Sequence, residues 1–365
     1  MKNHGKALAH ISAAFIVWRG VLWIIESVAP AFWPLYTRFL GPSFWSNFDG
    51  VYYLTIARVG GYGPYQQAFF PLYPILIRWL TKVSGIDDIT VSVLISHAAF
   101  FFGLLFFYLL ARDNDRKNAR WSLLLFLLFP TSFFFAATYT ESLFLLLSAL
   151  CLYAAKRQWW LVAGVSGYLA STTRFFGIFL FPAVLWEYVQ SRPRTRRWVH
   201  FIGICLIPLG LLSYMAYLNA SIGDPLAFFH AQSAFGAGRS GSSLILLPQV
   251  LWRYLKIFTS VSPLTLTYAI SLFEFLVLTM GAWLLWLGYK RRVRTSYLIY
   301  SLAILVTPTL TGTLSSLPRY ILSAFPLFFI FGSVHNTWIK ILAVMVSAVV
   351  LVLAATAFLQ GYFIA

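Results

Sequence analysis

The sequence predicts an all-α, polytopic membrane protein: a bundle of about eleven transmembrane helices with an interfacial helix in its first outer loop. Apolar residues make up 60% of the 365 residues, against roughly 45–50% in soluble globular proteins. Charged residues make up only 10%, against roughly 25%. The apolar residues also gather in runs of about 20, the length of a helix that crosses the hydrocarbon core. These observations exclude a soluble multidomain protein.

The candidate spans follow from these runs in chain order. They lie near residues 8–30, 89–111, 120–137, 139–155, 159–173, 175–190, 201–219, 264–288, 296–312, 319–334 and 339–363. The first span does not resemble a cleaved signal peptide, because Arg19 and Glu26 interrupt it and no small-residue cleavage pattern follows. Residues 1–365 therefore form a single integral membrane domain.

The net charge of +17 reflects a shortage of acids, ten against 27 bases, as expected where carboxylates are costly in lipid. The bases lie in short clusters between apolar runs and not along one face, so a nucleic-acid partner is not indicated. Cys151 and Cys205 both lie within apolar stretches and are interpreted as small core residues.

The distribution of lysine and arginine predicts the orientation. With the N-terminus in the cytoplasm, the cytoplasmic segments hold 17 of these residues, the opposite side nine, and Arg19 lies within the first span. The two sizeable loops, residues 31–88 and 220–263, then both face outward. We therefore expect any chemistry on the extracytoplasmic side, where ATP and nucleotide sugars are scarce.

Residues 44–62 of the first outer loop predict a short helix at the membrane interface. Ser46 and Asp49 have the spacing of a helix-capping pair, Arg58 falls in the last turn, and Gly60 and Gly61 provide a stop. The apolar stretch 68–80 that follows either dips into the bilayer or opens a tilted helix. Asp49 has two readings, a helix cap or a general base at the membrane surface, and both can hold at once.

Five stretches of this sequence resemble the PIG-V family of mannosyltransferases. The resemblance begins with FDGVYYLTIARVGGY (48–62) and AFFPLYPILIRWL (68–80), and continues with FPTSFFFAATYTESLFLLLS (129–148), TRFFGIFLFP (173–182) and LPRYILSAFPLF (317–328). The resemblance implies an integral membrane enzyme of the GT-C class. The chain lacks long outer insertions, which suggests a prokaryotic relative in the cytoplasmic membrane.

The resemblance also implies a reaction. Such enzymes move a sugar, here most simply mannose, from a polyprenyl-phosphate donor to a lipid or glycolipid acceptor, with inversion. The matching position for the catalytic base is Asp49. Arg319, Arg174 and Tyr320 are candidates to bind the donor phosphate. No cofactor is implied, and the sequence shows no clustered His and carboxylate ligands that demand a metal, although a divalent ion is left open.

The remaining candidates each have a structural alternative. Arg174 and Arg319 could instead extend to the interface without a function. Glu141 either pairs with Arg174 or caps its helix, or it holds the acceptor or tunes Asp49. Tyr52, Tyr53 and His230 are candidate acceptor-contacting or supporting residues. Asp113-Asn114-Asp115 copies a nucleotide-sugar signature but is interpreted as a solvated loop, because no α/β domain surrounds it.

Two alternatives to a mannosyltransferase are open at this stage. The first is a non-catalytic lipid or solute transporter, which fits the composition but should hold its key charges near the midplane. The second is transfer of another sugar, such as arabinose or glucose.

Overall fold

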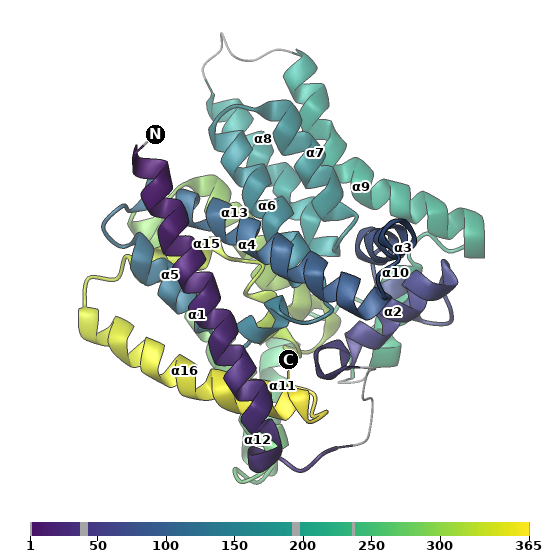
Figure 1. The fold of residues 1–365 in the computed structure, drawn as a ribbon, viewed down its shortest axis with the longest axis vertical. Coiled ribbons are helices and arrows are strands. Elements are labelled where there is room, and N and C mark those ends of the chain that lie inside the picture. The colour runs from purple at the N-terminus through teal and green to yellow at the C-terminus, as the bar shows by residue number, and fades with distance from the viewer. Residues whose placement is uncertain (1, 37–42, 192–197, 236–237, 365) are drawn as a thin grey trace.

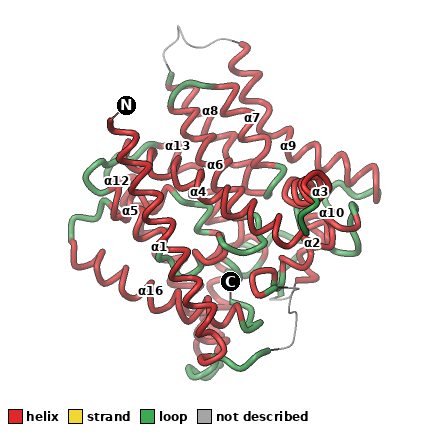
Figure 2. The backbone as a smooth tube through the Cα atoms, viewed as in Figure 1, coloured by secondary structure: helices red, strands yellow, loops and turns green. Residues whose placement is uncertain are grey.

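The computed structural model describes residues 2–36, 43–191, 198–235 and 238–364. Residues 37–42 of the predicted first outer loop, and 192–197 with four bases of a predicted cytoplasmic loop, lie outside the described residues. Within the described ranges the chain is helical and contains no strand (Figure 2). The predicted all-α class is confirmed.

Five helices are long and apolar enough to cross a membrane, and all five match predicted spans. They are α1 (Lys2–Phe32), α4 (Asp88–Asn114), α9 (Trp198–Ile222), α12 (Leu266–Lys290) and α16 (Thr337–Leu359). Shorter apolar helices fill other predicted spans: α6 (Glu141–Lys156), α7 (Trp160–Ser171), α8 (Leu180–Gln190) and α13 (Thr295–Val306). Figure 1 shows α6, α7 and α8 grouped at one end of the molecule beside α9, while α1 crosses α16 at the other.

Two predicted spans, 120–137 and 319–334, are not continuous helices, and a count of eleven is not confirmed. The first is divided into α5 (Ala119–Leu127) and a 3₁₀ turn, η3 (Ser132–Phe135). The second is divided into α14 (Leu317–Tyr320) and α15 (Pro326–Gly332). Pro130 and Pro326 explain the breaks, because proline lacks the N–H group that a continuing helix needs. Both breaks are buried within the bundle. Neighbouring protein groups can there form hydrogen bonds with the backbone groups that the interrupted helix leaves without partners.

The predicted short helix of the first outer loop is α2 (Asp49–Val59), and α3 (Leu72–Ser84) follows it. Gly60 ends α2 in the left-handed conformation with Arg58 in the last turn, as predicted. The predicted cap is wrong: Ser46 bonds Ser43 within the preceding 3₁₀ turn, η1 (Phe44–Ser46), and Phe48 precedes α2 instead. Tyr53, Leu54 and Ile56 are buried, so α2 packs into the bundle.

Polar residues collect at opposite ends of the bundle in the way that alternating spans require. At one end, Lys156 bonds Asp113 at 2.8 Å, and Arg294 bonds Glu187 at 2.5 Å. These residues all lie on the predicted cytoplasmic side. The predicted loop is wrong for Asp113, which lies in the last turn of α4 and is balanced by Lys156 of α6. Asp49 and its partners, described below, come from segments predicted for the other side.

Glycines allow α7 and α9 to approach closely. A Cβ atom on Gly164 of α7 would overlap the carbonyl oxygen of Gly203 on α9, and one on Gly210 would meet the backbone of Tyr168. Small residues at helix crossings are a common way to pack membrane helices. This contact is the most extensive between any two helices of the described chain.

We expect Gly164→Ala to lower the free energy of unfolding by about 1–3 kcal/mol, because the added methyl group must push the helix backbones apart. The unfolding midpoint of the purified protein in detergent measures the effect. Gly20→Ala is the matched control, since a Cβ there meets no atom within 4 Å and Gly20 also lies within a helix. Equal shifts for the two variants would contradict the close-packing account.

Candidate active site

A cavity of about 1000 Å³ lies among segments that are far apart in the sequence. Its lining comes from the start of α2, from η4 (Phe175–Phe179), from α10 (Ala227–His230) and η6 (Ala231–Phe235), and from η7 (Thr307–Thr311) and α14. The wall is largely aromatic. Among the described residues, four ionisable acid or arginine side chains line it: Asp49, Arg174, Arg239 and Arg319.

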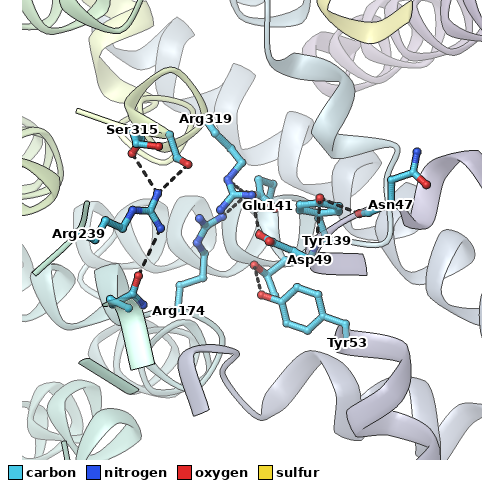
Figure 3. A network of polar contacts seen from close by, with 12 residues as sticks. Asn47, Asp49, Tyr53, Tyr139, Glu141, Arg174, Arg239, Ser315 and Arg319 are labelled. Atoms are coloured by element: carbon cyan, nitrogen blue, oxygen red, sulfur yellow. Dashed lines mark hydrogen bonds and ion pairs between the residues drawn. The ribbon is translucent and has the colours of Figure 1, made fainter. Parts of the chain in front are cut away.

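Asp49, Arg319, Glu141 and Arg174 form a chain of alternating charge (Figure 3). Arg319 Nη1 donates to Asp49 Oδ2 at 2.6 Å, and Arg319 Nε lies 3.3 Å from Glu141 Oε1. Arg174 Nη1 lies 2.5 Å from the same Glu141 oxygen. The side chains of Arg319 and Glu141 are 9% and 2% exposed, so each depends on its partners for compensation of its charge. Of the alternatives given for Glu141, the pair with Arg174 is confirmed, whereas the ion pair of Arg319 with Asp49 was not predicted.

The aromatic residues around this chain also bind its cations. The ring of Tyr320 lies 5.6 Å from the Arg174 guanidinium carbon and 5.4 Å from that of Arg319. Two of the cavity's guanidinium groups therefore lie against one ring of its wall.

Arg239 is the cation of the cavity whose described hydrogen-bond partners are all neutral, although the Glu274 carboxylate also acts on it electrostatically. It donates to Gln232 Oε1 at 3.5 Å, to the Ser315 carbonyl at 3.3 Å and to Ser316 Oγ at 3.0 Å. In Figure 3, Arg174 and Arg319 lie between Arg239 and Asp49. No local pattern singles out Arg239 beyond its place in the predicted second outer loop.

A buried polar pair supports the loop that Arg239 contacts. Tyr254, on α11 (Leu247–Ser260), donates to Glu274 of α12 and accepts a bond from the Leu314 amide at 3.1 Å. Both side chains are almost fully buried. This network fixes the backbone just before Ser315 and Ser316.

The other predicted residues fall into two groups. Tyr52, Tyr53 and Tyr320 line the cavity. Glu141 lies behind the lining, and His230 lies outside it, half exposed and paired with Asp224 at 2.7 Å. Among the described residues, no group of three His, Cys, Asp or Glu side chains could hold a metal ion.

Comparison with known proteins identifies a family match and a shared fold. Residues 32–191, a little under half of the chain, match the family Mannosyltransferase (PIG-V). The chain is similar to the crystal structure of ArnT from Cupriavidus metallidurans bound to undecaprenyl phosphate, with a TM-score of 0.53 and 14% identity over 95% of this chain and 76% of that chain. The archaeal oligosaccharyltransferase AglB from Archaeoglobus fulgidus, in complex with an inhibitory peptide and a dolichol-phosphate, gives a TM-score of 0.45 and 14% identity over 94% of this chain and 56% of that chain. No curated protein matches the chain.

These findings confirm two predictions. The motif-based resemblance to PIG-V agrees with the family match, whose range contains Asp49, Glu141 and Arg174. ArnT is a GT-C glycosyltransferase, and the likeness to it extends over nearly the whole chain, so the GT-C fold is confirmed. Together they support a multi-pass integral membrane glycosyltransferase.

We expect Glu141→Gln to lower the free energy of unfolding by about 3–5 kcal/mol, because it leaves two nearly buried guanidinium groups without their shared carboxylate. Chemical or thermal unfolding in detergent measures the loss. Asp88→Asn is the control: it breaks the pair with Arg58, which is 53% exposed, and should change stability by no more than about 1 kcal/mol. If the two variants were equally stable, the buried chain would not be a source of stability.

Proposed function

We propose that this protein transfers mannose from a polyprenyl-phosphate donor to a lipid or glycolipid acceptor on the extracytoplasmic face, with inversion, and that Asp49 is the general base. The family match supports the sugar. The observation that carries the proposal is a single carboxylate, Asp49, facing an aromatic cavity that also holds three arginines. The undecaprenyl phosphate bound to ArnT, which shares this fold, supports the class of donor.

The geometry suggests what each group does. Among the described residues, only Arg319 bonds the Asp49 carboxylate, and it does so through Oδ2. Oδ1 is thus open to accept the proton of an acceptor hydroxyl. The acceptor oxygen then attacks the anomeric carbon, and the bond from that carbon to the phosphate oxygen breaks. A positioned base contributes about 10²–10⁴-fold to such a rate.

The leaving phosphate would be held by arginine. The donor is a phosphodiester with one negative charge, and the released polyprenyl phosphate carries up to two. Cations that face this group therefore bind the transition state more strongly than the ground state. Arg239, whose described hydrogen-bond partners are neutral, and Arg174 are the cavity cations available for that contact.

An apolar wall suggests a place for the prenyl chain. Phe175 and Phe179 of η4 and Pro308 and Leu310 of η7 line the cavity. η4 continues directly into α8, and η7 directly follows α13. Both helices are apolar. A prenyl chain that follows this apolar wall would leave the charged part of the cavity without crossing a polar region.

The transporter alternative is not favoured by the distribution of charge. Asp49, Arg174, Arg239 and Arg319 converge at one cavity lined by helix ends and by segments of the two outer loops, although Arg319 itself lies on one of the broken helices. A transporter is instead expected to hold its key charges near the midplane. A transporter would move polyprenyl-phosphate mannose without cleaving it. Release of free polyprenyl phosphate from purified protein with donor and a membrane lipid extract therefore separates the two functions.

Asp49→Asn should lower the rate of mannose transfer by about 10²–10⁴-fold, because the amide cannot accept the proton. Radiolabelled donor and thin-layer chromatography of the lipid products measure it. Asp224→Asn is the matched control, since Asp224 also lies in an outer loop but outside the cavity, and it should keep the wild-type rate. Wild-type transfer by a folded Asp49→Asn variant would remove the base assignment.

Arg239→Ala should raise the KM for the donor by about 10- to 100-fold, which corresponds to losing one hydrogen bond to a charged group. Lys256→Ala, which removes an exposed cation of the same outer segment outside the cavity, should leave the KM unchanged. Steady-state kinetics over a range of donor concentrations distinguish the two. An unchanged KM in Arg239→Ala would assign the phosphate to the other arginines.

A further inference from the structure

The residues around Asp49 form a tight turn in an unusual conformation. The Gly50 amide donates to the Asn47 carbonyl at 3.2 Å, which closes a four-residue turn. Phe48 in this turn has φ 56° and ψ −113°, close to the values of the first central residue of a type II′ turn. Glycine normally occupies that position, because a Cβ atom is crowded there. The chain instead has phenylalanine, so the turn needs support from outside itself.

One buried hydroxyl bridges this turn. Tyr139 donates to the Asn47 carbonyl at 2.9 Å and accepts a bond from the Asp49 amide at 3.2 Å. Its ring is only 1% exposed, so both contacts are shielded from water. The turn is also attached at a second point, because Asn47 Nδ2 donates to the Phe358 carbonyl at 3.0 Å.

Tyr139 also links the turn to the charged chain. It precedes Glu141 by two residues, and its ring lies 5.5 Å from the guanidinium carbon of Arg319. The amide of neighbouring Thr138 donates to the Trp45 carbonyl at 2.9 Å, just before the turn. The segment that carries Glu141 thus also determines the position of the Asp49 backbone (Figure 3).

We propose that Tyr139 is a positioning residue: its hydroxyl holds the strained turn and so fixes Asp49 relative to the acceptor. This inference rests on the proposed function, because it assigns a task to the same site. The Asp49 amide is one of the N-terminal donors that a helix leaves without an internal partner. Without the hydroxyl, this amide loses its partner and Phe48 can relax. A displacement of about 1 Å at a reacting group can lower a rate about 10²-fold.

Tyr139→Phe tests the proposal, because it keeps the ring with its contacts to Arg319, Phe134 and Phe358 and removes only the hydroxyl. We expect kcat to fall about 10- to 100-fold while the KM for the donor stays within about twofold. Hydrogen exchange of peptides that cover residues 44–54 should increase. The exchange is a readout that does not depend on any substrate.

Tyr73→Phe is the matched control. Tyr73 is also fully buried, and its hydroxyl contacts the Ser92 carbonyl at 3.0 Å and Ser96 Oγ at 2.9 Å, outside the cavity. It should keep kcat and leave exchange of residues 44–54 unchanged, even if the unfolding midpoint falls. Equal losses of kcat in the two variants would reduce Tyr139 to a structural role and overturn the proposal.

The two proposals can fail separately. If wild-type protein releases no polyprenyl phosphate from the mannose donor, the proposed function is wrong. Hydrogen exchange of residues 44–54, compared between wild type and Tyr139→Phe, then remains as the test of the role of Tyr139. Unchanged exchange of residues 44–54 in Tyr139→Phe then overturns the positioning role, and increased exchange supports it. If the wild type is active and Tyr139→Phe keeps both its kcat and its exchange, only the positioning proposal is lost.

Discussion

The need to compensate buried charge dominates the structure around the cavity. A guanidinium or carboxylate group within a helix bundle loses its hydration and must find partners of opposite charge. Arg319 meets this need with two carboxylates, and Glu141 with two guanidinium groups. The resulting chain joins residues that lie up to 270 positions apart, from α2, α6, α14 and the position just before η4. The positions of these four segments are therefore coupled.

The two proline breaks make this arrangement possible. A continuous helix would turn successive side chains around its axis and keep its backbone bonds internal, leaving few groups free to form a site. At the breaks, Thr131 Oγ1 instead donates to the Pro318 carbonyl at 2.6 Å, which joins one broken segment to the other. Arg319 follows this contact directly, and the first break leads to Tyr139 and Glu141. Both breaks thus bring polar side chains to the same site, where Arg319 lines the cavity and Tyr139 and Glu141 lie outside its lining.

Much of this could be predicted from sequence, because lipid imposes simple rules. Hydropathy identified the five long helices, Gly60 marked the end of α2, and the motifs singled out Asp49, Arg174 and Arg319. The Glu141–Arg174 pair followed from the high free energy of an isolated membrane carboxylate. The prediction of a continuous helix over 120–137 was wrong. Hydropathy is averaged over a window of residues and does not detect that a proline interrupts the backbone hydrogen bonds of a helix.

Other parts of the site have no local signal in the sequence. Arg239 resembles any loop arginine until its contacts to Ser315 and Ser316 are known. Tyr139 is one of 20 tyrosines, and its task depends on a turn 90 residues away. The strained conformation of Phe48 cannot be recognised from the sequence either, because the residue preferences of a type II′ turn call for glycine at this position. Such residues act through tertiary contacts, which no periodicity encodes.

The order of charges along the cavity matches the direction of the proposed reaction. Asp49, Arg319, Glu141 and Arg174 sum to zero, so the proposed base belongs to a neutral assembly and Arg319 is shared with a second carboxylate. Arg239, beyond that assembly, adds a positive charge whose described hydrogen bonds all go to neutral groups, with Glu274 acting on it only through space. During transfer the Asp49 carboxylate would lose its negative charge to a proton while the phosphate gains one. Negative charge would therefore move across the cavity toward Arg239, the direction in which a fixed arrangement of cations lowers the barrier.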